Sequence, residues 1–184
     1  FSFNSKPVKV DMISRHLKTI APDANIVALK ESVVKSSTAR ALLDRDVIFC
    51  CTDEHWGRSI VNQIAYQYMI PAINMGVQID SKDGVIRGAS GSVHIIRPDA
   101  PCLWCYELLS GKRIRTESLP AEQRDSELRE GYVENIDEKA PSVISLTTTM
   151  SGHAVTAFLQ LLTDFRGANG GFHCLNYNVM EGTI

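Results

Sequence analysis

The chain has 184 residues, of which 44% are hydrophobic, and a formal net charge of −2 at pH 7. This length suits one compact domain, and the hydrophobic fraction is ample for a buried core. The small negative charge gives no sign of the basic surface that is typical of nucleic-acid-binding proteins, so we expect no nucleic-acid partner other than a tRNA substrate. No uninterrupted apolar run in the sequence approaches the roughly 18 residues of a membrane-spanning helix, so we expect no membrane segment.

The cysteines argue against a secreted, disulfide-linked protein. There are five of them, an odd number, and Cys50 and Cys51 are adjacent. A secreted disulfide framework normally uses an even number of cysteines in a regular spacing. We therefore predict a reducing environment and a cytoplasmic location.

The first part of the chain alternates between helix and strand patterns. Apolar residues three and four positions apart predict an amphipathic helix over residues 9–21. Branched residues predict strands over residues 25–29 and 47–51, with a short helix over residues 37–43 between them. Such alternation is typical of an α/β fold with a mostly parallel sheet and helices on both faces.

The second part combines one more parallel strand with an antiparallel extension. A helix pattern through residues 60–68 leads to a strand over residues 72–75. The next short strands, residues 85–86 and 92–96, are interrupted by glycines, which predicts antiparallel strands with bends. The last elements are a polar surface excursion over residues 117–140 with a helix at 122–130, a long helix at 142–165 and a final strand at 172–177.

A candidate ligand site lies where the strand of residues 47–51 ends. Thr52 and Asp53 follow this strand directly, and Arg58 lies five positions further on. Ligands of α/β sheets commonly bind at the carboxyl ends of strands. Two simpler interpretations remain open, because Asp53 can also cap the next helix and Arg58 can form a surface ion pair that contributes little to stability.

These residues resemble the ThiF/MoeB/HesA superfamily, the bacterial relatives of ubiquitin-activating enzymes. The resemblance covers roughly three quarters of the chain and is carried by several segments in matching order. They are Lys9-Val10 at a helix start, Cys51-Thr52-Asp53 with Arg58, Ile70-Pro71 leading to Gly76, the glycine-marked stretch 84–91, and Pro101-Cys102-Leu103-Trp104-Cys105. The resemblance implies a Rossmann-like fold in one adenylation domain over residues 1–184.

The resemblance also implies ATP-dependent adenylylation of a carboxylate, commonly the C-terminus of a ubiquitin-like or sulfur-carrier protein. Lys9 would contact the phosphates, Asp53 would organise Mg²⁺ and the nucleotide together with Thr52, and Arg58 would support this loop. A cation near the reacting phosphate and a carboxylate that holds Mg²⁺ suit this chemistry. Family members commonly act as dimers, so we expect a homodimer.

Zinc is a further implied ligand. Cys102 and Cys105 have the spacing of one half of a zinc site. Many family members carry a second such pair near the C-terminus, whereas this chain has only Cys174, which follows His173. His173 and Cys174 could substitute for the second pair, and two reduced structural cysteines are the alternative.

Two features of the family are not found in the sequence. The glycine-rich phosphate loop, with the acidic residue and the arginine that accompany it, is absent, so we expect the N-terminal β-α unit to precede Phe1 and this chain alone to bind ATP weakly. No cysteine lies in residues 117–140. In family members that form a thioester or persulfide, the reactive cysteine lies in that region.

Three alternatives to adenylylation of a carrier protein remain open, and the missing cysteine supports the first of them. The first is a non-catalytic relative that acts as a dimeric protein-binding module. The second is a ThiF-like enzyme that modifies tRNA. The third is a dinucleotide oxidoreductase or a thiol-disulfide enzyme built around Cys102 and Cys105, for which the sequence has no companion thioredoxin pattern.

Overall fold

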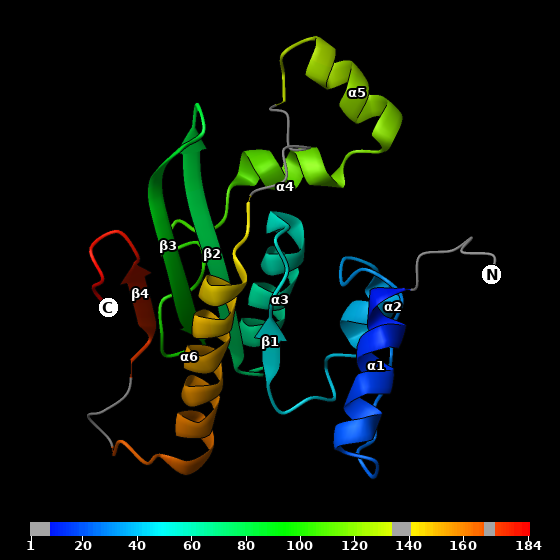
Figure 1. The fold of residues 1–184 in the computed structure, drawn as a ribbon. Coiled ribbons are helices and arrows are strands. Elements are labelled where there is room, and N and C mark those ends of the chain that lie inside the picture. Colours follow the sequence, from blue (N-terminus) through cyan, green and yellow to red (C-terminus); the bar gives the residue numbers. More distant parts are fainter. Residues whose placement is uncertain (1–7, 134–140, 168–171) are drawn as a thin grey trace, which may run out of the picture.

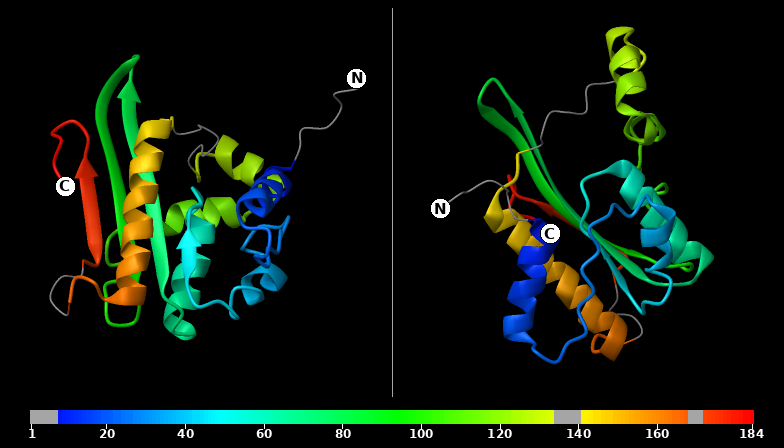
Figure 2. Two further views of the ribbon diagram at one scale, coloured as in Figure 1. Left: turned by 60° about the horizontal axis from the view of Figure 1, so that its bottom comes forward. Right: turned by 90° about the vertical axis from the view of Figure 1, so that its right-hand side faces the viewer.

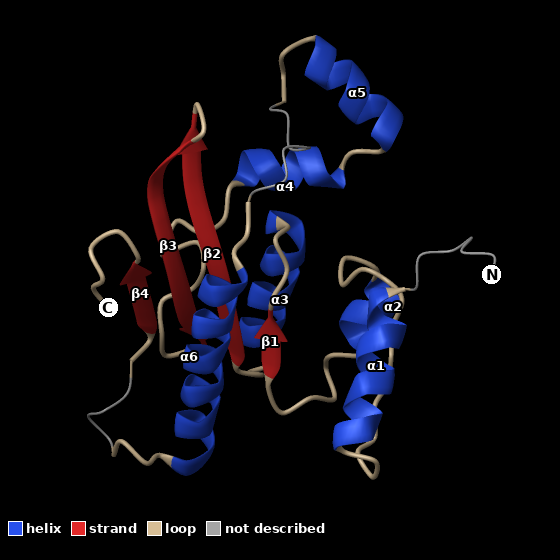
Figure 3. Ribbon diagram, in the orientation of Figure 1, coloured by secondary structure: helices blue, strands red, loops and turns tan. Residues whose placement is uncertain are grey.

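The computed structural model describes residues 8–133, 141–167 and 172–184 (Figure 1). Four strands and six helices are found in this part of the chain, and Figure 3 distinguishes them by colour. In chain order they are α1 (Lys9–Ile20), α2 (Ser36–Arg40), β1 (Ile48–Cys50), α3 (His55–Gln67), β2 (Ala72–Lys82), β3 (Val85–Ile96), α4 (Gly111–Ser118), α5 (Ala121–Arg129), α6 (Ile144–Thr163) and β4 (Cys174–Asn178).

The strands form one mixed sheet in the order β1-β2-β3-β4. β1 pairs with β2 in parallel, whereas β2 with β3 and β3 with β4 are antiparallel. The predicted α/β class and its antiparallel extension are therefore confirmed. Within the described residues, however, the sheet is not mostly parallel, because the extension contributes two of the three pairings.

A tight turn joins the long antiparallel strands β2 and β3. Asp83 and Gly84 both have positive φ angles, 54° and 76°, and they join Lys82 to Val85, which are cross-strand partners. An Asp-Gly pair in the left-handed region is the preferred two-residue hairpin connection. The two short strands predicted over residues 85–86 and 92–96 are parts of one continuous strand, β3.

Helices cover both faces of the sheet, as the sequence predicts (Figure 2). On one face, α3 packs its buried residues against the first two strands and the end of β3. On the other face, α6 packs against β2 and β3. The first core cluster includes Ile48, Cys50, Val61, Ile64, Ala65, Ala72 and Ile96, and the second contains Ile73, Val93, Ile95, Met150, Ala154 and Ala157.

One predicted element is absent and one observed helix was not predicted. Residues 25–29 do not form a strand; strand backbone needs a paired neighbour, and β1 pairs only with β2 among the described strands. The sequence also gave no signal for α4. This helix is polar apart from Ile114, so it lacks the apolar periodicity that predicts helices, and contacts with α3 stabilise it instead.

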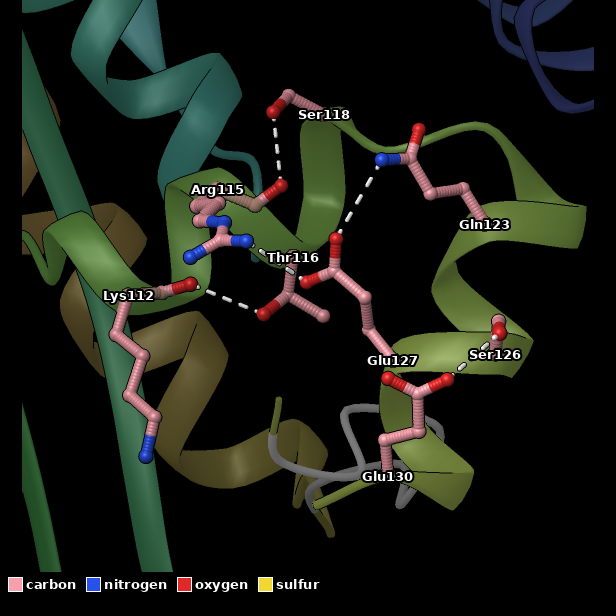
Figure 4. Close-up of polar contacts among 8 residues, drawn as sticks. All are labelled: Lys112, Arg115, Thr116, Ser118, Gln123, Ser126, Glu127 and Glu130. Carbon is pink, nitrogen blue, oxygen red and sulfur yellow. Dashed lines mark hydrogen bonds and ion pairs between the residues drawn. The ribbon is translucent and has the colours of Figure 1, made fainter. Parts of the chain in front are cut away.

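The helix predicted over residues 122–130 is present as α5 and projects from the body of the molecule (Figure 1). No residue of α5 is buried. Figure 4 shows its connection to α4, in which Arg115 pairs with Glu127 at 3.0 Å and Gln123 donates to the same carboxylate. The end of the predicted excursion, residues 134–140, lies outside the described residues.

Close packing at Gly91 joins β3 to α6. A methyl group added to the Gly91 Cα would lie 2.5 Å from the sulfur of Met150, and the Met150 side chain is fully buried. Glycine at this position therefore allows α6 to approach the sheet.

Among the described residues, no helix is both long and apolar enough to cross a bilayer.

We expect Gly91→Ala to lower the free energy of unfolding by about 1–3 kcal/mol, because the added methyl group would force the fully buried Met150 side chain to shift within the core. Chemical denaturation measures the effect. Gly152→Ala in α6 is the matched control, since nothing lies within 4 Å of the added methyl group; it should stabilise the protein by about 0.5–1 kcal/mol. Equal effects of the two substitutions would contradict the packing argument.

Candidate functional site

The loop between β1 and α3 is held at its beginning by Arg58. The Arg58 Nε atom donates a hydrogen bond of 2.9 Å to the carbonyl oxygen of Thr52, and the Thr52 hydroxyl accepts from the amide of Glu54 at 3.3 Å. Gly57 allows α3 to approach this loop, because an added methyl group would lie 3.2 Å from Thr52. The loop conformation therefore depends on residues of the following helix.

Asp53 stands at the exposed point of this loop. Its carboxylate has no hydrogen-bond or ion-pair partner in the part of the chain that the structure describes. Lys9, the first residue of α1, lies close to the same strand end: burial raises the pKa of the Cys51 thiol, and the nearby Lys9 ammonium opposes this rise. A free carboxylate and an exposed cation thus lie at one edge of the sheet.

The Arg58 guanidinium lies across β2. A methyl group added to Gly76 would lie 3.0 Å from one of its terminal nitrogens, so glycine leaves room for the side chain. Arg58 is half-buried and has no carboxylate partner among the described residues. Its remaining N–H groups can therefore bind an anion that enters from outside.

A carboxylate from α4 holds the other end of the loop. Glu117 accepts hydrogen bonds from the amides of His55 at 3.1 Å and Trp56 at 2.6 Å. The His55 ring in turn accepts from the Ser110 amide at 3.1 Å. Burial lowers the pKa of His55 although Glu117 acts in the opposite direction. These contacts anchor both ends of α4 to the first turn of α3.

A pocket of about 660 Å³ opens beside Arg58. It lies on the face of the sheet that α3 covers only in part, and its lining comes from β2, β3 and β4 together with Leu108 and Thr183. Glycines and polar side chains dominate the lining. They include Gly76, Gln78, Asp80, Gly88, Ser90, Ser92, Asn176 and Asn178.

Sequence reasoning missed this pocket, although a signal was present. In residues 72–80, polar or small residues alternate with Ile73, Met75, Val77 and Ile79. Such a period of two places one kind of residue on each face of a strand. The strand register then aligns the polar positions of neighbouring strands on one face.

Two buried polar side chains lie on the same face beyond the pocket. Asn74 and His94 are cross-strand partners, each is 2% exposed, and Asn74 Oδ1 and His94 Nδ1 lack hydrogen-bond partners within the described residues. Burial, followed by the positive charge of Arg58, lowers the pKa of His94 to about 4. His94 is therefore neutral at physiological pH and adds no second positive charge beside Arg58.

The geometry can be compared with known proteins. The profile of the ThiF family matches residues 3–183. The chain belongs to the ThiF family. A search of the curated proteins found no match. ThiF membership agrees with the α/β sheet, and it confirms the resemblance that the sequence carries.

Three of the predicted site residues, Thr52, Asp53 and Arg58, lie in or against the loop after β1. Lys9 lies near enough to Cys51, which directly precedes Thr52, for its charge to affect that thiol. Asp53 is suited to Mg²⁺ that arrives with a nucleotide, because Mg²⁺ in such sites uses one or two carboxylates, substrate phosphates and water. The free carboxylate of Asp53 fits this requirement.

The predicted cysteine pair lies elsewhere. Cys102 and Cys105 bring their sulfurs within 3.4 Å, on a turn that Asn62 in the middle of α3 holds through the Leu103 amide at 2.9 Å. Burial opposes ionisation of Cys102, but hydrogen bonds from Cys105 outweigh it and lower the pKa of Cys102.

The cysteine turn offers only half of a structural zinc site. All five cysteines are free thiols, and the described residues contain no group of three or more His, Cys, Asp or Glu side chains that could hold a metal ion. A structural zinc site normally uses four protein ligands. His173 and Cys174 therefore do not complete the site within the described part of the chain.

We expect the free energy of unfolding to decrease as the pH falls from about 6.5 to 4. The unfolded protein binds a proton on His94 in this range, whereas the folded protein does not. A shift from 6.5 to about 4 corresponds to about 3 kcal/mol. Denaturation of His94→Gln across this range should show a smaller slope.

The matched control is His16→Gln, which changes an exposed histidine of α1 and should keep the wild-type slope. His55 contributes in the same direction as His94, because its pKa is also lowered. A slope that is identical in all three proteins would contradict the assignment of a neutral, buried His94.

Proposed function

We propose that this ThiF-family protein adenylylates a carboxylate at the expense of ATP. The observation that carries this proposal is the position of Arg58, which contacts the Asp53 loop through Thr52 and also lines the polar pocket. A nucleotide held at the loop and an acceptor held in the pocket would therefore meet at one guanidinium.

The nucleotide would bind at the carboxyl end of β1. Lys9 would contact phosphate oxygens, and Asp53 would hold Mg²⁺, with the Thr52 hydroxyl nearby. Bound Mg²⁺ would supply charge neutralisation on the phosphates. Exposure of Asp53 and the lack of a protein partner for its carboxylate among the described residues support this role.

The acceptor would be the extended C-terminus of a ubiquitin-like or sulfur-carrier protein. A groove lined by glycines and polar side chains leaves room for a peptide and offers hydrogen-bonding groups to its backbone. The acceptor carboxylate would bind Arg58, which has two terminal nitrogens suited to a carboxylate. We infer that the pocket binds this terminal segment.

The reaction requires two anions to approach each other. An oxygen of the acceptor carboxylate attacks the α-phosphorus of ATP, a new P–O bond forms, and the bond to the leaving pyrophosphate breaks. Arg58 and Lys9 reduce the repulsion between the carboxylate and the phosphates, and such preorganised charges are a major source of catalysis. The product is a mixed anhydride of the acceptor and AMP.

The proposed function is also compatible with a cytoplasmic location, zinc binding and dimerisation. A cytoplasmic location suits free thiols, and Zn²⁺ at Cys102 and Cys105 would need further ligands. Dimerisation could use α6, which exposes Val155, Leu159 and Leu162. We do not propose a covalent transfer step, because residues 117–140 contain no cysteine.

The main test is ATP–pyrophosphate exchange by the full-length protein with ubiquitin-like and sulfur-carrier proteins as acceptors. Asp53→Asn should reduce exchange about 100-fold or more, since a ligand of the catalytic metal is lost. Asp44→Asn removes the same charge from an exposed position and should have no effect.

The possible outcomes separate the candidate functions. Exchange that is unaffected by Asp53→Asn would refute the site assignment. Stable binding of a carrier protein without any exchange would favour the protein-binding module, and exchange that depends on tRNA would favour a tRNA-modifying enzyme.

The role of Arg58 has its own test. Arg58→Lys keeps the charge but loses the planar fork that can bind Thr52 and a carboxylate together. We expect KM for the acceptor to rise about tenfold, with a smaller change in KM for ATP. Arg87→Lys, at an exposed position of β3, is the control, and equal acceptor KM values in both variants would contradict the pocket assignment.

A further inference from the structure

We propose that Glu117 positions the Asp53 loop and thereby sets the affinity of the site for Mg²⁺. This inference rests on the proposed function and assigns a role in it to α4, a helix outside the site residues that the sequence predicts. Glu117 touches neither nucleotide nor acceptor in this scheme. It acts through the backbone of α3, so it is a positioning residue.

The first observation is the way in which α3 begins. The first amides of a helix have no partners within the helix, and a side chain of the N-cap residue usually binds one of them. Here the N-cap residue Glu54 makes no such bond. Glu117, more than sixty positions along the chain, binds the amides of His55 and Trp56 instead.

The charge of Glu117 makes these bonds strong. A carboxylate at a helix N-terminus interacts favourably with the helix dipole, and hydrogen bonds to an ionised acceptor are stronger than neutral ones. Both bonds lie in a partly buried environment, where water competes less well for the amides. The start of α3 is therefore strongly held by α4.

The second observation is that the loop is held at two points with Asp53 between them. Arg58 binds the carbonyl group of Thr52 on one side, and Glu117 binds His55 and Trp56 on the other. Asp53 and the N-cap residue are exposed, and nothing else among the described residues restrains the Asp53 carboxylate. Its position consequently depends on these two anchors.

The third observation is that α4 itself is firmly placed. The Ser110 hydroxyl caps α4 by accepting from the Arg113 amide, and the Ser110 amide donates to His55. Thr116, next to Glu117, is 1% exposed and donates to the Lys112 carbonyl oxygen. Glu117 therefore projects from a fixed support, which a positioning residue requires.

Two variants and one control test the proposal in the full-length protein. Glu117→Gln removes the charge at constant size, and Glu117→Asp keeps the charge but is too short to reach both amides. Glu122→Gln makes the same charge change on the exposed first turn of α5. The thermal melting of each variant shows whether it is folded.

The first readout does not need catalysis. Amide hydrogen exchange over residues 52–56, measured without nucleotide, should accelerate about tenfold in Glu117→Gln and by a smaller factor in Glu117→Asp, because the loss of a charged hydrogen bond favours local opening by this order. Glu122→Gln should match the wild type. Unchanged exchange over residues 52–56 in both Glu117 variants would overturn the proposal.

The second readout is the Mg²⁺ dependence of ATP–pyrophosphate exchange. Groups outside the metal's own ligands that orient a ligand typically contribute about tenfold or more to metal affinity. Glu117 orients Asp53 through the backbone of the loop, so Glu117→Gln should need about tenfold more Mg²⁺ for half-maximal exchange. A role in stability alone would lower the active fraction without moving this midpoint. An unmoved midpoint would therefore overturn the proposal.

The two readouts separate this inference from the proposed function. A wild-type protein that shows no pyrophosphate exchange with any acceptor refutes adenylylation, and the claim about Mg²⁺ affinity with it. The amide-exchange result still decides whether Glu117 positions the loop. An active wild-type protein with an unmoved midpoint refutes the role of Glu117 and leaves adenylylation intact.

Discussion

The Arg58 side chain links the loop after β1 to the polar pocket on β2, β3 and β4. Its hydrogen bond of 2.9 Å to the Thr52 carbonyl group ties α3 to the loop that follows β1, and the same guanidinium extends over Gly76 to the edge of the pocket. The cation has no carboxylate partner among the described residues. Its charge is therefore available to a ligand, and the loop, the pocket and the neutral His94 are arranged around it.

Around this cation the sheet separates two kinds of environment. The face under α6 is an apolar core, and its role is to stabilise the sheet. The opposite face is apolar where α3 covers it and polar beyond Asn74 and His94, where the pocket opens. Because residues of β2 and β3 alternate between the faces, the same strands supply both the core and the lining. A rigid apolar layer beneath a polar surface suits a site that must hold two substrates in fixed positions.

Helix α4 connects the segment after the cysteine turn to the candidate site. Sequence patterns indicate a polar excursion beginning at residue 117, and α5 does project from the molecule (Figure 1). Glu117 nevertheless binds the backbone at the start of α3. A segment that shows no apolar periodicity can therefore still be structurally linked to a site, through hydrogen bonds to backbone groups that carry no sequence signal.

The sequence alone determined the α/β class, the two core helices, the antiparallel extension with its glycine bends and the candidate residues at the end of β1, because periodicity, glycine placement and motif order are local properties. It also contained the alternation that marks the pocket. Only the tertiary structure decided that residues 25–29 do not form a strand, that α4 is helical and that Glu117 caps α3. These outcomes depend on which distant segments become neighbours, and pairing partners, buried amides and shared anchors are properties of the packed chain rather than of any stretch of it.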